Sequence, residues 1–335
     1  MKSIAKPYVL YADKLESGKK LSIPPHAIKT EKHLAFSCDL DTIGDGRITV
    51  GHGKEISSGS WIEITKDEIK AFSYYEYTDP KYRELIKPMA HGLEIKGVVN
   101  VVIDVNPRDK MTTVIFSTST GMVKESFGGW DGCAGEIFAE VEGFTATNCK
   151  FSWYSEGFSR KIWVFGDSYL GFGHPKRWPY YLYRDGYNHN MLSGFPGMSA
   201  HEAIREFEYI AECGTPEFAV WALGMNNTDL DGKISELYLS STERFIEICK
   251  ERGITPILAT IPLVSEREHR FKNEWVRSQP YRYIDFARAV GSEGDVNWYP
   301  EMLSADRVHP DTKGAEALYM QVLVDFPEIM QRTNS

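Results

Sequence analysis

From Lys161 onward, short apolar segments alternate with amphipathic segments, and this alternation restricts the possible folds more than any other feature of the sequence. Buried strands are expected at Ile162–Phe165, His189–Leu192, Phe218–Leu223, Thr255–Ile261 and Tyr281–Ile284. Helices are expected at Ser199–Cys213, Lys233–Arg252, Ser265–Arg277 and Asp311–Phe326. Because strands that alternate with helices pair in parallel through right-handed crossovers, residues 158–335 are predicted to form a three-layer α/β/α domain around a parallel sheet.

Residues 1–157 show a different pattern, in which strand-like segments recur between turn signals such as Gly44-Asp45-Gly46 and Gly128-Gly129. With scarcely any helical periodicity, this pattern is typical of a β-sandwich, and we predict an all-β domain of the lectin-like, jelly-roll type. Its role is left open between carbohydrate binding, a wall of the active site and a contribution to stability. Strands are expected at His33–Leu40, Arg47–Gly51, Ser60–Thr65, Ile69–Tyr77, Gly97–Val105, Met111–Ser117, Met122–Phe127, Glu136–Val141 and Phe144–Trp153, with Val98–Val105 buried on nearly both faces.

Composition excludes several classes of partner. The formal charge of −9 over 335 residues gives no basic stripe, so we expect no nucleic-acid partner. No apolar run is long enough to span a membrane, and the N-terminal segment lacks the apolar core of a signal peptide. The cysteines are scattered and form no CxxC pair, which favours reduced thiols in a cytoplasmic protein. They are Cys38, Cys133, Cys149, Cys213 and Cys249.

Four local features of the second half lie where a strand ends or a helix begins. Gly166-Asp167-Ser168 follows the first expected strand, and Gly197 precedes the first helix. Asn226 follows the strand Phe218–Leu223, and Asp306 and His309 precede the last helix. Open parallel sheets bind their ligands at this edge, so we expect these side chains to lie close together.

These four blocks, in this order, resemble the SGNH hydrolases, also called the GDSL esterase superfamily, over roughly Lys161–Pro327. The resemblance implies a flavodoxin-like fold with Ser168 as nucleophile, His309 as general base and Asp306 as the residue that orients it. It also implies an oxyanion hole made of the Ser168 amide, the Gly197 amide and the Asn226 side chain. Two positions depart from the family pattern, Tyr169 in place of leucine and Asn227 in place of aspartate.

The residue types support this chemistry independently of the resemblance. A serine hydroxyl needs an imidazole to take its proton, and the imidazole needs a carboxylate to fix its tautomer. No cofactor or metal is called for. Each residue also has a structural alternative, since Asp306 can cap a helix, His309 can be a surface residue, and Gly197 and Asn226 can serve turns. Asp229 and Asp231 are weaker candidates for catalytic acids, because the helix that follows them calls for an acid or a cap at its N-terminus. His174 is interpreted as a loop residue.

We therefore predict a serine esterase that hydrolyses short acyl esters, acetyl esters of carbohydrates in particular. Bulky residues around Ser168 are expected to limit the acyl side: Tyr169, Phe172, Trp178 and Met225. The residues expected to contact substrate are Tyr169, Trp178, Met225 and Trp298. The expected partner is a small-molecule or oligosaccharide ester, and the sequence leaves the acyl group, the alcohol and the oligomeric state open. The alternatives are a lipase or acyl-thioesterase of the same superfamily, and a non-catalytic carbohydrate-binding protein with a decayed hydrolase domain.

Overall fold

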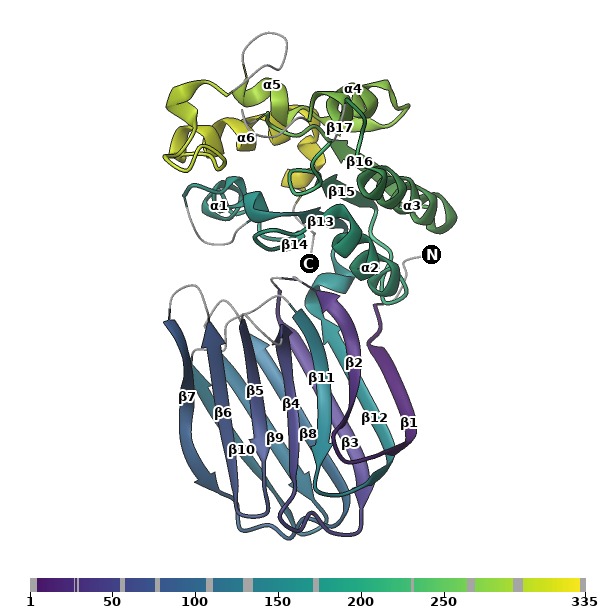
Figure 1. The fold of residues 1–335 in the computed structure, drawn as a ribbon, viewed down its shortest axis with the longest axis vertical. Coiled ribbons are helices and arrows are strands. Elements are labelled where there is room, and N and C mark those ends of the chain that lie inside the picture. The colour runs from purple at the N-terminus through teal and green to yellow at the C-terminus, as the bar shows by residue number, and fades with distance from the viewer. Residues whose placement is uncertain are drawn as a thin grey trace. The chain divides into compact units, whose positions relative to one another are not determined.

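The structure is a computed structural model. It describes residues 5–331 apart from 27, 29, 55–57, 76–78, 107–110, 129–134, 171–174, 230–231, 264–268 and 292–297. The chain divides into two compact units, Ala5–Glu156 and a unit that contains Gly157–Ser335. The first is built of strands and the second of alternating strands and helices (Figure 1).

The first unit consists of two six-stranded sheets in which every strand pairing is antiparallel. The two sheets lie face to face (Figure 1). One sheet has the order β1 (Tyr8–Leu15), β12 (Ala146–Ser155), β3 (Lys32–Leu40), β8 (Gly97–Asn106), β9 (Met111–Thr118) and β10 (Gly121–Gly128). The other has the order β2 (Lys19–His26), β11 (Gly135–Glu142), β4 (Arg47–Lys54), β5 (Ser58–Ile64), β6 (Glu68–Tyr75) and β7 (Asp79–Ala90).

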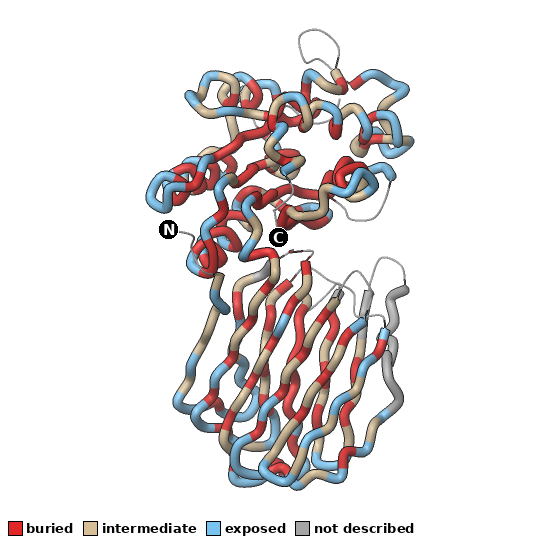
Figure 2. Tube along the Cα trace, turned by 180° about the vertical axis from the view of Figure 1, so that it is seen from behind, coloured by how far each residue is buried: buried red, intermediate tan, exposed pale blue. Residues whose placement is uncertain are grey.

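The strands of this unit bury alternate residues, as Figure 2 shows by the alternating colours along the tube. In β8 the inward side chains Val99, Val101 and Ile103 are buried, while Val98 is 55% exposed. The prediction that this segment is buried on nearly both faces is therefore wrong, because its outer face is open to solvent. The jelly-roll arrangement stays a prediction.

The sequence pattern missed β1, β2 and β7, and each of them is an edge strand. An edge strand tolerates proline and polar residues, because one side of its backbone need not pair. Pro24 and Pro25 lie in β2, and Pro80 and Pro88 lie in β7. Signals that normally argue against a strand therefore concealed two of the three.

The second unit is built on a five-stranded parallel sheet. Counted from β13, the spatial order is 2-1-3-4-5, which is the flavodoxin-like order of a doubly wound sheet. The strands are β14 (Met191–Gly194), β13 (Ile162–Gly166), β15 (Phe218–Ala222), β16 (Thr255–Ala259) and β17 (Arg282–Ile284). The predicted parallel sheet is confirmed.

Two groups of helices cover this sheet from opposite sides (Figure 1). In one group α2 (Ala200–Ile210) packs against α3 (Glu236–Arg252), and in the other α6 (Thr312–Asp325) contacts both α1 (Trp178–Arg184) and α5 (Phe286–Val290). The expected helices match α2, α3, α6 and the described part of α4 (Arg270–Ser278), whereas the short α1 and α5 were not predicted. Short 3-10 helices complete the chain: η1 (Glu156–Ser159), η2 (Ser168–Leu170), η3 (Pro300–Met302) and η4 (Pro327–Met330).

An aromatic layer fixes α2 and α3 to the sheet. Phe207 of α2 lies edge-on to Phe165 of β13 at 5.2 Å between ring centroids, and Phe245 of α3 stacks on Trp221 of β15 at 4.6 Å. All four rings are buried, and burying such a side chain contributes about 1.5–3 kcal/mol. The ends of β13 and β15 are therefore held rigidly, and the candidate site is built on them.

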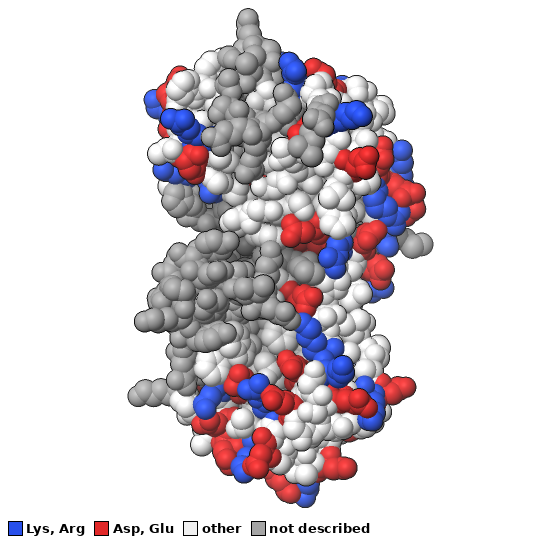
Figure 3. Space-filling model, in the orientation of Figure 1, with Lys and Arg blue, Asp and Glu red and all other residues white. Residues whose placement is uncertain are grey.

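No helix in the described residues is both long and apolar enough to cross a membrane. Among the coloured side chains on the face that Figure 3 shows, Lys and Arg are interspersed with Asp and Glu.

Candidate active site

Ser168 begins the 3-10 helix η2 directly beyond the end of β13. The turn is closed by Asp167, whose carboxylate accepts from the Tyr169 N–H at 3.1 Å and whose carbonyl accepts from the Leu170 N–H at 3.0 Å. Gly166 makes this turn possible, because a Cβ there would lie 2.6 Å from a Leu170 side-chain carbon. The strand end thus positions Ser168 at the carboxyl edge of the sheet, with 7% of the residue exposed.

A chain of two hydrogen bonds joins Ser168, His309 and Asp306. The distance from Ser168 Oγ to His309 Nε2 is 2.8 Å, and the distance from His309 Nδ1 to Asp306 Oδ2 is also 2.8 Å. Residues that lie far apart in the sequence therefore meet in the order predicted for a nucleophile, a base and a carboxylate. This geometry allows the imidazole to take the serine proton while the carboxylate fixes its tautomer.

The Asp306 carboxylate is held in place by its own loop. Its Oδ1 accepts hydrogen bonds from the backbone N–H groups of Val308 and His309 and from the Ser304 hydroxyl, each at 2.9 Å. Burial alone would raise the pKa of Asp306, but these bonds and the bond from His309 Nδ1 hold it well below the ordinary value. Asp306 therefore remains an anion that faces His309.

The three predicted oxyanion donors follow three neighbouring strands of the sheet. Gly166 pairs with Gly194 of β14 on one side and with Ala222 of β15 on the other, so the loops that carry Ser168, Gly197 and Asn226 start at adjacent points. The Asn226 side-chain amide donates to the Met198 carbonyl at 3.0 Å, which brings Asn226 against the Gly197 loop.

Gly197 adopts a φ of +84°, a conformation that favours glycine. Within the described residues, the backbone N–H groups of Ser168 and Gly197 donate to no protein acceptor. Such N–H groups at strand ends can bind the oxygen of a tetrahedral intermediate.

Asn227, one of the two departures from the family pattern, links this loop to its surroundings. Its side-chain Oδ1 accepts from the Ala200 N–H at 2.9 Å, at the start of α2. Its carbonyl accepts from the ammonium group of Lys272. The amide in place of a carboxylate thus still connects the loops that carry Gly197 and Asn226.

Asp229, interpreted from the sequence as a helix-capping acid, accepts from the N–H of Ser235, the residue before α3, at 2.9 Å. It also forms an ion pair with Lys272, which the sequence did not indicate, with 2.6 Å between Oδ1 and Nζ. Both side chains are fully buried. Asp229 therefore connects the loop to the start of α3 and to Lys272. Asp231, Phe172 and His174 lie outside the described residues.

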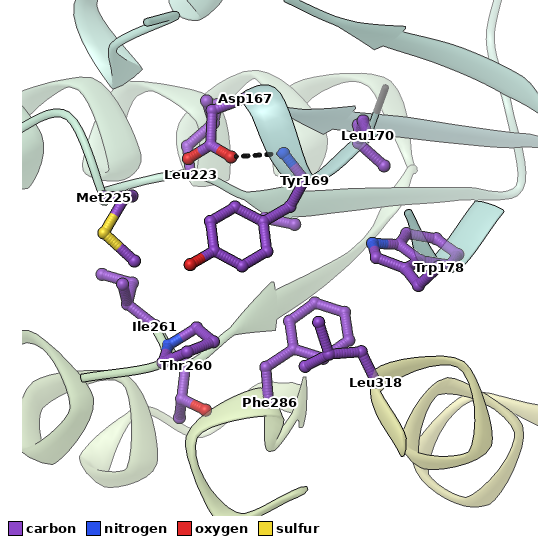
Figure 4. A pocket seen from close by; sticks show the side chains of 12 residues that line it. Asp167, Tyr169, Leu170, Trp178, Leu223, Met225, Thr260, Ile261, Phe286 and Leu318 are labelled. Carbon is purple, nitrogen blue, oxygen red and sulfur yellow. Dashed lines mark hydrogen bonds between the residues drawn. The ribbon is translucent and has the colours of Figure 1, made fainter. Parts of the chain in front are cut away.

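The four residues predicted to contact substrate are largely buried. Tyr169, Trp178 and Met225 line one small cavity of about 20 Å³ beneath the nucleophile turn (Figure 4). Ser168 and His309 are not among its lining residues. The Trp298 ring lies 6.2 Å from the Tyr169 ring, and the Tyr169 hydroxyl donates to the Val308 carbonyl at 2.5 Å. These residues pack under the site, and Tyr169 connects the turn of Ser168 to the loop of His309.

Sequence reasoning missed two residues at this site, Lys272 and Ser304. Lys272 lies on α4, far along the chain from the loop that it contacts, and nothing in the amphipathic pattern of this helix distinguishes it. Ser304 lies just before Asp306, so its proximity was a signal that could have been used. Among the described residues, no group of His, Cys, Asp and Glu could hold a metal ion.

No protein-family model matches the chain, and no curated protein sequence matches it. Solved structures of similar fold cover about half of the chain. One, from Desulfitobacterium hafniense, is proposed to be a lipolytic protein of the G-D-S-L family; it is 16% identical over 49% of this chain and 98% of its own, with a TM-score of 0.40. Another is a carbohydrate esterase of family 3 from Talaromyces cellulolyticus, with 17% identity over 51% and 98% and a TM-score of 0.39. A GDSL-like lipase from Bacteroides thetaiotaomicron is 15% identical over 49% and 85%, with a TM-score of 0.37.

Proposed function

We propose that this chain is a serine esterase of the SGNH type that hydrolyses short acyl esters, acetyl esters of carbohydrates in particular. The observation that carries the proposal is the hydrogen-bonded chain from Ser168 Oγ through His309 to Asp306. Ester hydrolysis by a serine nucleophile uses this order of groups, and the surrounding loops hold each of them.

In the proposed mechanism, His309 Nε2 takes the Ser168 proton as Oγ attacks the ester carbonyl carbon. Asp306 accepts the hydrogen bond from Nδ1 and stabilises the imidazolium that forms. The carbonyl oxygen becomes an oxyanion, which the N–H groups of Ser168 and Gly197 and the side-chain amide of Asn226 stabilise.

His309 then donates its proton to the leaving alcohol, and the acyl group remains on Ser168. A water molecule, deprotonated by the same imidazole, attacks the acyl-enzyme. The acid leaves and Ser168 regains its proton. Every step uses groups that belong to this chain, and no cofactor is part of the proposal.

The packing around the nucleophile turn supports a short acyl group. Tyr169, Trp178 and Met225 fill the space beneath the nucleophile turn, and each is at most 8% exposed. The cavity that they line is large enough for about one water-sized group.

The proposal keeps two further predictions. The β unit is interpreted as a lectin-like jelly-roll that binds carbohydrate, shapes the site or adds stability. We also propose a cytoplasmic location, which the four described cysteines support because all of them are free. The expectation of no nucleic-acid or membrane partner is kept.

A fluorophosphonate probe, which reacts with activated serines, tests the proposal. The wild-type protein should be labelled, Ser168→Ala should not, and Ser240→Ala, which changes an exposed serine of α3, should be labelled normally. Ser168→Ala should also lower kcat by about 10⁴-fold or more on acetylated oligosaccharides while the protein stays folded. A folded wild-type protein that is neither labelled nor active would favour the non-catalytic alternative.

A further inference from the structure

Arg177 is a half-buried cation at the start of α1, immediately before Trp178. Its guanidinium donates to the carbonyl of Lys176 at 3.0 Å through Nη1. Within the described residues, no carboxylate lies within ion-pair distance of it. By contrast, the partly buried Arg277 is paired with Asp285 at 2.7 Å. A partly desolvated cation without a direct ion pair is costly, and an anionic ligand would complete its surroundings.

The position of Arg177 places it beside the proposed triad. The Tyr181 hydroxyl lies 3.1 Å from the Pro175 carbonyl and 2.9 Å from the Thr312 carbonyl, so the segment before α1 is fixed against the chain just beyond His309. Trp178, the next residue, shares the cavity beneath Ser168 with Tyr169.

The electrostatic surroundings agree with this placement. Burial lowers the pKa of Arg177, whereas Tyr169, Asp306 and Asp167 act in the opposite direction. The carboxylates of the nucleophile turn and of the His309 loop thus favour the charged guanidinium without forming an ion pair with it. It remains a cation, because a guanidinium keeps its proton in proteins.

We propose that Arg177 binds a carboxylate on the alcohol part of the substrate, so that the preferred substrate is an O-acylated acidic sugar. This inference rests on the proposed esterase function. An acetyl group carries no charge, so the anion must belong to the alcohol. The guanidinium is planar and offers paired N–H donors, a geometry that suits a carboxylate better than an uncharged hydroxyl.

The kinetic test compares O-acetylated methyl glucuronoside with O-acetylated methyl glucoside, which differ only in the carboxylate. The wild-type enzyme should prefer the glucuronoside. Arg177→Gln should lower kcat/KM on it by about ten- to a hundredfold, mainly through KM, because a hydrogen-bonded charge pair is lost. The glucoside should change by less than about threefold by the same reasoning, and Arg177→Lys should restore part of the loss.

Arg244→Gln is the matched control, since Arg244 lies on α3 and is paired with Glu208 at 3.0 Å. It should leave both substrates unchanged. Equal losses on both sugars for Arg177→Gln, or no wild-type preference, would overturn the inference.

A binding measurement separates this inference from the proposed function. The inactive Ser168→Ala variant is titrated with unacetylated methyl glucuronoside by calorimetry, with and without Arg177→Gln. The affinity should fall at least about tenfold when Arg177 is replaced. If the glucuronoside binds Ser168→Ala in an Arg177-dependent way but the wild type hydrolyses no ester, the esterase proposal fails and the anion site stands. If binding does not depend on Arg177, the anion site fails whatever the esterase result.

Discussion

Lys272 Nζ lies 2.6 Å from Asp229 Oδ1, and neither side chain is exposed to solvent. The same ammonium group donates to the Asn227 carbonyl and lies 3.2 Å from His269 Nδ1. A buried ion pair is weak evidence for stability, because desolvation offsets most of the attraction. The position of this pair indicates another role, since Asn227 directly follows the proposed oxyanion donor Asn226. Lys272 thus fixes the loop that aims Asn226.

Lys272→Met should therefore lower kcat by about tenfold or more, with a smaller change in KM, because the oxyanion donor is displaced. It should also destabilise the protein by about 3–5 kcal/mol, since Asp229 is left without its partner. The double variant Lys272→Met/Asp229→Asn should recover stability but not kcat.

A double-mutant cycle with Asn226→Ala checks this mechanism. If Lys272 acts through Asn226, Lys272→Met should cost little additional kcat once Asn226 is absent. Additive losses would contradict a positioning role. Arg282→Met, which removes the surface pair with Glu328, serves as the control and should keep full kcat.

Asn226→Ala should lower kcat by about 10²–10³-fold with little change in KM, because the donor matters most once negative charge has developed. Steady-state kinetics on p-nitrophenyl acetate measures both constants. Asn190→Ala, which removes a buried amide that bonds to the Ile329 carbonyl, should reduce stability but not kcat. An effect of Asn226→Ala on KM alone would show that Asn226 binds substrate instead.

The hydrogen bonds to Asp306 predict a dependence of stability on pH. Because the pKa of this carboxylate is lower in the folded protein than its ordinary 3.8, ionised Asp306 stabilises the fold above that pH. The contribution is lost as pH falls below 3.8 towards the folded value. Urea unfolding of the wild type and of Asp306→Asn should show a difference in free energy that is constant near neutral pH and shrinks in acid. A difference that does not vary with pH would contradict this assignment.

The second unit could be predicted from sequence because its signals are local. Apolar runs such as Ile162–Phe165 and long amphipathic segments such as that of α3 carry their own periodicity. Helices α1 and α5, with 7 and 5 residues, are too short to show any. In the first unit, the order of strands within each sheet depends on pairings between distant segments, and no local pattern encodes them.

In the candidate site, too, the residues in local motifs could be predicted from sequence, and those that depend on tertiary contacts could not. Ser168, Gly197, Asn226, Asp306 and His309 stand in short motifs at element ends, and the structure brings Ser168, His309 and Asp306 into hydrogen-bond contact. Lys272 and the Tyr169 hydroxyl could not be predicted, because their partners, Asn227 and Val308, are close only in the folded chain. Supporting contacts of this kind depend on tertiary packing and have no sequence spacing of their own.

Acyl chain length gives the last prediction. Tyr169, Trp178 and Met225 are packed beneath the nucleophile turn, so we predict that short acyl groups fit and that longer ones meet occupied volume. We expect kcat/KM to fall as p-nitrophenyl esters lengthen from acetate to octanoate. With an apolar groove, kcat/KM would instead rise with chain length, since each buried methylene contributes about 0.8 kcal/mol, or about fourfold in kcat/KM. Met225→Ala should shift the preference towards butyrate by opening the cavity, whereas Met320→Ala, at an exposed position of α6, should not. A wild-type kcat/KM that rises along the series would show that the space is not filled, and the lipase or thioesterase alternative would then be favoured.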